Sequence, residues 1–135
     1  MLRWRFATYV TGNGRSNVQG DIDDFDDFGI EDFAAAVRHL APTAKEHWDE
    51  PHALKLKGRK DLYEIRFKNA RKQTRALGHF AGDTFIITVI CTHKSRVYDP
   101  PESFQTAEDR RVALGKGQAS ATSLKIHGVD FPPVP

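Results

Sequence analysis

The amino-acid sequence predicts one small domain of the mixed α/β class, in its α+β form. Two patterns support this prediction. Residues 62–92 contain three adjoining strand patterns separated by polar turns, and residues 30–48 carry an apolar stripe at helical spacing. A length of 135 residues suits a single domain with a modest hydrophobic core.

A strand and a helix are expected in the first 48 residues. Residues 3–11 are typical of a strand, and a Gly-Asn-Gly sequence ends it. Residues 30–48 are expected to be helical, with Pro42 either bending the helix or beginning a second one. The apolar stripe of this helix consists of Phe33, Val37, Leu40, Ala44 and Trp48.

An acidic segment precedes that helix. Residues 15–29 have no periodicity and are expected to form a loop, and positions 21–32 hold seven acids and no base. The spacing does not fit a calcium loop, because Phe28 and Ala35 fall at ligand positions, so no metal site is predicted. The loop is interpreted as solvated carboxylates near a helix N-terminus, or as a shield over a basic face.

Three strands are expected in the middle of the chain. Residues 62–68 alternate in polarity, and residues 73–80 return after a four-residue polar loop. A two-residue turn at Gly82-Asp83 then leads into residues 84–92, which are apolar on both faces, as expected of a central strand.

This arrangement predicts a register. Arg66 is expected opposite Arg75, and Arg75 opposite Ile90, with Lys94 on the same face. Because like charges on neighbouring strands repel, a face that gathers three cations is expected to bind a polyanion. The alternative is a solvated face with separated cations, since a one-residue slip would scatter the cluster.

The C-terminal part is expected to contain one more helix. Residues 95–103 are interpreted as a loop, and residues 104–114 as a short basic helix that glycines end. The domain is therefore expected to span residues 1–117, and residues 118–135 to be a tail that is mobile or draped over it.

Composition points to a nucleic acid and to the cytoplasm. The net charge is only +2, but residues 55–75 hold nine bases against two acids, a typical nucleic-acid-facing pattern. The single Cys91 lies in an apolar strand and is expected to be a buried thiol, in keeping with a reducing compartment. No signal peptide and no membrane-spanning run is recognised.

Several of these residues together resemble the RelE/ParE superfamily of toxins, and most of all its phage-derived HigB-like branch. The resemblance covers roughly residues 30–116. Its elements are Leu56-Lys57-Gly58, Leu62-Tyr63-Glu64-Ile65-Arg66, Arg75, the apolar strand that ends in His93-Lys94, and Thr106-Ala107 at the start of a basic helix.

The resemblance implies a RelE-like fold, with N-terminal helices packed on a twisted, mainly antiparallel sheet and a short C-terminal helix. It implies the toxin of a type II toxin–antitoxin system, a cofactor-free and metal-independent mRNA endoribonuclease (mRNA interferase) that acts on the ribosome. The expected partners are mRNA, the ribosome and a cognate antitoxin, a helix-turn-helix protein. The alternative is a non-nuclease relative, either a gyrase inhibitor or an inactive phage-derived accessory protein.

The resemblance also suggests catalytic residues. Arg66, Arg75 and Lys94 match positions where family members carry functional basic residues. The sequence departs from the family pattern at two positions, because Glu64 stands where the RelE branch has lysine and Phe104 where RelE has tyrosine. The identity of the general base is therefore left undetermined. Tyr98 is a candidate replacement for that tyrosine.

Cleavage of RNA by the 2′-hydroxyl of the RNA itself needs a base that removes the 2′ proton, cations that stabilise the phosphorane and an acid that protonates the leaving oxygen. The candidate bases are His93, His79 and Glu64, although Glu64 is as readily an ion-pair partner of Arg66. In the predicted register His79 shares the arginine face, whereas His93 faces away unless a bulge precedes it. The residues expected to bind RNA are Lys55, Lys57, Arg59, Lys68, Tyr98, Arg110 and Arg111.

Overall fold

The computed structural model describes residues 2–127 and 129–131. Within this part of the chain, a seven-stranded sheet has the order β2-β3-β4-β5-β1-β7, and β6 pairs with β5 off this path. All pairs are antiparallel except β1 with β5. The strands are β1 Arg5–Val10, β2 Ala53–Lys55, β3 Tyr63–Asn69, β4 Lys72–Ala81, β5 Thr84–Lys94, β6 Val97–Asp99 and β7 Ser120–Ser123. A separate two-stranded sheet is made by β8 Lys125–Ile126 and β9 Val129–Asp130.

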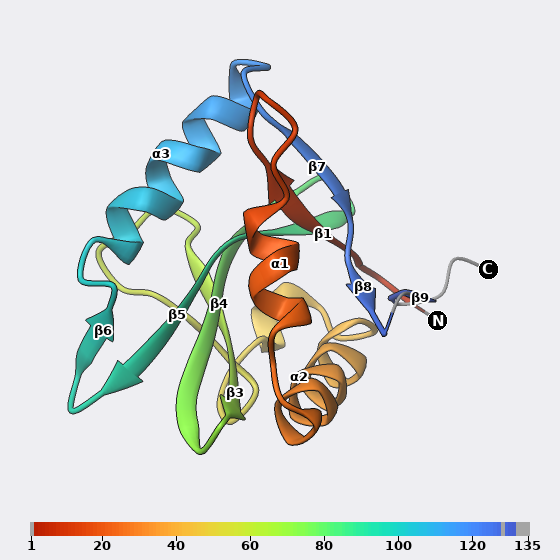
Figure 1. Cartoon of the computed structure of the whole chain (residues 1–135), viewed down its shortest axis with the longest axis vertical. Coiled ribbons are helices and arrows are strands. Elements are labelled where there is room, and N and C mark those ends of the chain that lie inside the picture. The colour runs from red at the N-terminus through yellow and green to blue at the C-terminus, as the bar shows by residue number, and fades with distance from the viewer. Residues whose placement is uncertain (1, 128, 132–135) are drawn as a thin grey trace.

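The helices cover both faces of the large sheet (Figure 1). On one face, α1 (Asn17–Asp23) and α2 (Asp27–Leu40) enclose the main core, in which Phe33 and Leu40 meet strand residues such as Ile65. On the other face, α3 (Ser103–Gly115) places Ala107 over a smaller apolar cluster that includes Leu77. The predicted α+β class, with a mainly antiparallel sheet and a C-terminal helix, is confirmed.

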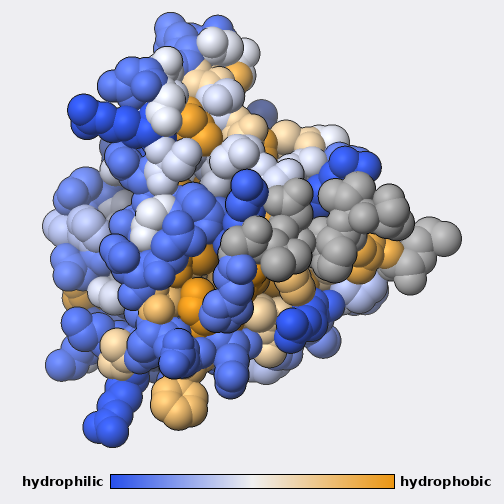
Figure 2. Space-filling view, turned by 45° about the vertical axis from the view of Figure 1, so that its right-hand side comes forward, coloured by the Kyte–Doolittle hydropathy of each residue, from blue (hydrophilic) through white to orange (hydrophobic). Residues whose placement is uncertain are grey.

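The outer surface is mainly polar, in contrast to the apolar core. Figure 2 shows a face that is mainly hydrophilic, with small scattered apolar areas. None of the helices in the described residues has the length and apolar content needed to span a bilayer.

Three expected boundaries are wrong. The acidic loop over 15–29 instead contains α1, and α2 begins at Asp27, where the Asp26 carboxylate accepts a 2.6 Å hydrogen bond from the Gly29 amide. The helix expected over 30–48 ends at Leu40, because Pro42 has no backbone N–H with which to continue the helical hydrogen bonds, and a short 3₁₀ turn, η1 (Lys45–His47), follows. The loop expected over 95–103 contains β6.

The C-terminal segment is also more ordered than expected. β7 pairs with β1, and Leu124 and Ile126 are buried, so residues 120–126 belong to the domain and its predicted end at residue 117 is wrong. The last four residues of the predicted tail, 132–135, lie outside the described residues.

The register of the β3–β4 hairpin agrees with the prediction. Arg66 is opposite Arg75, although the connection is a two-residue turn and not a four-residue loop. The turn residues Ala70 and Arg71 have φ values of 52° and 65°, as a type I′ turn requires. The expected two-residue turn at Gly82-Asp83 is also present.

A bulge changes the register of β4 with β5. Leu77 pairs with Val89 but Gly78 pairs with Ile87, so Thr88 is an extra residue on β5. The strands approach so closely here that a Cβ atom on Gly78 would lie 2.2 Å from the Ile86 carbonyl oxygen.

The bulge exchanges the two faces of β5 beyond Thr88. Arg75 is therefore opposite Cys91 and not Ile90. Because side chains alternate along a strand, His93 joins the face of Arg75 and Lys94 moves to the opposite face. The predicted position of Lys94 beside the arginines is wrong.

Candidate functional site

The Glu64 carboxylate lies at the centre of a polar cluster on the α3 side of the sheet. Arg66 Nε donates a 2.6 Å hydrogen bond to Glu64 Oε2, and Arg75 Nε lies 3.2 Å from the same oxygen as an ion pair. The Tyr98 hydroxyl donates to Glu64 Oε1 from β6. Glu64 has no exposed surface, so one buried carboxylate holds two guanidinium groups side by side.

The two arginines differ in access. The side chain of Arg66 is 23% exposed, and its Nη1 donates to Glu50 Oε1 at 3.0 Å. Burial alone would lower the pKa of Arg66, but the bonds to Glu64 and Glu50 outweigh it and raise that pKa. This guanidinium is permanently charged and reaches solvent.

Arg75 is nearly enclosed, with 8% of its side chain exposed. Its Nη1 donates to the Thr74 carbonyl oxygen at 3.0 Å and its Nη2 to Gln73 Oε1 at 3.2 Å. Burial lowers the pKa of Arg75, against the attraction of Glu64. Arg75 is therefore suited to position its neighbours and to contribute positive charge.

His93 extends the cluster toward solvent. Its Nδ1 lies 3.4 Å from Gln73 Oε1, and its ring packs 4.6 Å from the ring of Tyr98. Burial and the bond to Glu64 raise the pKa of Tyr98, which keeps its hydroxyl protonated at neutral pH. The partly exposed imidazole of His93 lies at the edge of the cluster.

Two hollows adjoin the cluster. The first, of about 490 Å³, lies against the exposed side of Arg66, and Lys68, His52 and Gln73 also line it. The second, of about 770 Å³, lies between the ends of the β3–β4 and β5–β6 hairpins and is lined by Gln73 and His93, among others. Gln73 borders both, so both hollows lie beside the same part of the cluster.

His79 is not available to this site. It shares the strand face of Arg75, as predicted, but it is buried near Arg111 of α3, and four residues of strand place it roughly 13 Å from Arg75. Burial lowers the pKa of His79 to about 4, and the charge of Arg111 acts in the same direction. His79 is therefore a neutral core residue.

Three residues expected to bind RNA have structural contacts. Arg110 Nη1 donates a 2.6 Å hydrogen bond to the carbonyl oxygen of Thr88, the extra residue of the bulge. Arg111 Nη1 donates to the Lys60 carbonyl oxygen at 2.7 Å. Arg59 pairs with Glu108 at 2.9 Å and lies over the Phe104 ring.

The predicted lysines divide into two groups. Lys68 lines the first hollow, and its backbone amide donates to Asp32 Oδ2 at 2.7 Å. Lys55 lies with its Nζ 6.0 Å from the centre of the Tyr63 ring, and Lys57 is exposed in the following loop. Neither Lys55 nor Lys57 lines either hollow.

The sequence reasoning missed two residues of the site. Gln73 joins Arg75 to His93, and its position two residues before Arg75 on a strand was a signal that both share a face. Glu50 reaches Arg66 from a connecting segment, and nothing in the sequence indicates that contact.

The cluster offers bases and cations but no constellation of metal ligands. Within residues 2–127 and 129–131, no three His, Cys, Asp or Glu side chains are arranged to hold a metal ion. The chain matches no protein-family model, no curated protein and no solved structure.

Proposed function

We propose that this protein is a metal-independent endoribonuclease that cleaves mRNA and serves as the toxin of a type II toxin–antitoxin pair. The observation that carries the proposal is the shared carboxylate of Glu64, which holds Arg66 and Arg75 together beside a hollow that both arginines line. A partly exposed guanidinium with a second cation behind it suits a phosphodiester, because guanidinium groups donate charge-assisted hydrogen bonds to phosphate oxygens.

Among the three candidate bases, exposure and contacts favour His93 for this proposal. Glu64 has no exposed surface and both of its oxygens are engaged. His79 is covered near α3. His93 is partly exposed, borders the second hollow and is joined to Arg75 through Gln73.

The proposed reaction is a transesterification within the RNA. His93 accepts the proton of the 2′-hydroxyl while the 2′-oxygen forms a bond to phosphorus, and the bond from phosphorus to the 5′-oxygen breaks. The leaving 5′-oxygen takes a proton from water, the hydroxide that remains takes the proton from His93, and the products are a 2′,3′-cyclic phosphate and a 5′-hydroxyl. Arg66 stabilises the negative charge of the phosphorane, and Arg75 adds charge from behind it.

The proposed setting is the cytoplasm, with message on the ribosome as the substrate. The proposed partner is an antitoxin of the helix-turn-helix class that lays a helix or a strand over the basic face or the sheet edge. These statements rest on the family resemblance of the sequence.

The test is induced expression of the chain, followed by growth measurement and primer extension on translated messages. Expression is expected to arrest growth and to cut mRNA. Arg66→Gln and His93→Gln are expected to reduce cleavage by about 100-fold or more, the size of a missing acid–base or charge contribution. Lys116→Gln, which removes an exposed cation outside both hollows, is the control and is expected to cleave normally.

One observation favours a protein that binds without cleaving. Nη1 and Nη2 of Arg75 donate hydrogen bonds within the protein, and its buried Nε lies 3.2 Å from Glu64 Oε2 without a hydrogen bond, an arrangement that a purely structural arginine would also show. Growth arrest with DNA damage and uncut mRNA would replace the nuclease by a gyrase inhibitor. Normal growth on expression would indicate an inactive accessory protein.

A further inference from the structure

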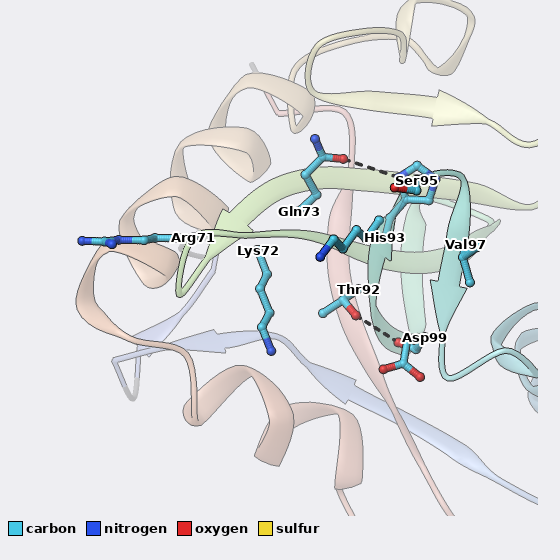
Figure 3. A pocket seen from close by; sticks show the side chains of 9 residues that line it. Arg71, Lys72, Gln73, Thr92, His93, Ser95, Val97 and Asp99 are labelled. Atoms are coloured by element: carbon cyan, nitrogen blue, oxygen red, sulfur yellow. Dashed lines mark hydrogen bonds between the residues drawn. The ribbon is translucent and has the colours of Figure 1, made fainter.

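The second hollow extends to the face of the sheet opposite the arginines. Gln73 and His93 share the face of Arg75, so their strand neighbours Lys72 and Lys94 belong to the other face. Figure 3 shows Gln73 and His93 pointing toward each other, with Lys72 and Thr92 on the other side of the strands. The lining includes residues of both sets, so the hollow borders both faces of the sheet at the hairpin ends of β4 and β5.

The lining of this hollow is cationic. Arg71, Lys72 and Lys94 line it, and Asp99 is the one acidic residue among the described residues that do so. In the part of the chain that the structure describes, neither Lys72 nor Lys94 is within 4.0 Å of a carboxylate oxygen, whereas Arg66 and Arg75 are both paired with Glu64. The charges of the two lysines are therefore available to a ligand.

An exposed apolar side chain lies beside these charges. Val97 lines the same hollow and is 61% exposed. Thr92 Oγ1 is within 3.4 Å of the Asp99 carbonyl oxygen, which ties β5 to β6 next to the hollow. Cations beside an exposed apolar side chain suit a strand of nucleic acid whose bases are unpaired. The cations then contact the phosphates, and the apolar side chain contacts the face of a base.

We propose that this hollow binds a phosphate of the same RNA strand, a few nucleotides away from the cleaved bond. The strand passes from Arg66 and His93 on one face to Lys72 and Lys94 on the other, around the ends of β4 and β5. The inference rests on the proposed function and adds the substrate class, which is single-stranded RNA. A duplex cannot follow this path, because its two base-paired strands form a rigid helix that does not bend around the end of a sheet.

The test separates binding from cleavage by using an RNA oligonucleotide with 2′-O-methyl groups, which lacks the attacking hydroxyl. Binding is measured by fluorescence anisotropy over a range of salt concentrations. The variant Lys72→Gln/Lys94→Gln is expected to bind about tenfold more weakly. The slope of log affinity against log salt is expected to fall by about 0.7 for each phosphate that the variant no longer neutralises. Lys116→Gln is the matched control.

Two further measurements complete the design. With cleavable RNA, the double variant is expected to raise KM and leave kcat unchanged, because it removes binding energy away from the reacting phosphate. A duplex of the same sequence is expected to bind the wild-type protein more weakly than the single strand and with no difference between wild type and double variant.

The outcomes distinguish the two proposals. Equal affinity and equal salt slope in the double variant and the control overturn the second site and leave the nuclease proposal intact. The same holds if the duplex binds as tightly as the single strand. If the oligonucleotide binds as expected but cleavable RNA stays intact, the nuclease proposal fails and the binding path stands.

Discussion

Replacement of Glu64 by glutamine tests the centre of the cluster. Glutamine has nearly the same shape, so the change removes one negative charge and keeps an oxygen. Arg66 loses the partner at 2.6 Å and Arg75 the partner at 3.2 Å. Arg66 retains Glu50 and contact with water, whereas Arg75 is left charged in a nearly closed environment. The destabilisation should therefore come mainly from Arg75.

The expected size follows from burial. Removal of one partner from a buried ion pair destabilises a protein by about 3–5 kcal/mol, and the remaining amide oxygen places Glu64→Gln near the lower end, at about 3 kcal/mol. For a chain of 135 residues this corresponds to a fall in Tm of roughly 10 °C. Glu108→Gln removes the half-exposed partner of Arg59 and is expected to change stability by less than about 1 kcal/mol.

Urea unfolding followed by circular dichroism measures both variants. The double variant Glu64→Gln/Arg75→Met removes the unpaired charge as well and is expected to recover a large part of the stability, because a buried ion pair is often replaceable by apolar side chains. If Glu64→Gln is no more destabilising than Glu108→Gln, or if the double variant is the least stable of all, Glu64 does not hold the arginines as described.

Two other predictions concern buried titratable groups. Because burial lowers the pKa of His79 to about 4, the unfolded chain binds a proton at this residue more readily than the folded protein does. The contribution of His79 to the free energy of unfolding is therefore complete above pH 6.5 and is lost as the pH falls toward 4. From pH 7 to pH 5 the wild type should lose about 2 kcal/mol more than His79→Gln in urea unfolding, and equal losses would contradict the burial of a neutral imidazole. Burial raises the pKa of Cys91 to about 12, so its thiol should react with an aromatic disulfide reagent only after unfolding; fast labelling in native buffer would contradict this.

The sequence was sufficient where local chemistry determines structure. The alternation in β3 and the polar connection at residues 69–72 predicted the pairing of Arg66 with Arg75, and Gly82-Asp83 predicted the turn between β4 and β5. Both predictions depend on signals within a few residues of the strands concerned, namely alternating polarity and turn residues.

Other elements lacked such signals. All four residues of β7 are exposed, so it joins the sheet through backbone hydrogen bonds to β1 and shows no apolar alternation. α1 has seven residues, of which Val18 and Ile22 are its buried side chains, too few to establish a helical period. Pairing and packing with distant segments, which no local pattern encodes, produce both elements.

The bulge at Thr88 shows how one residue decides which groups can act together. Without it, Lys94 would stand beside Arg75 and His93 would lie on the opposite face, so the cluster would hold cations but no partly exposed imidazole. With it, His93 joins the arginines and the lysine becomes available on the other face. Two features hold this bulge in place, the absence of a side chain on Gly78 and the bond from Arg110 to the Thr88 carbonyl oxygen. Gly78 was the one local signal, because a glycine inside a strand pattern often marks a bulge or a close approach of two backbones. Arg110 thus supports the register of β5, and through it the arrangement of the site, by this hydrogen bond.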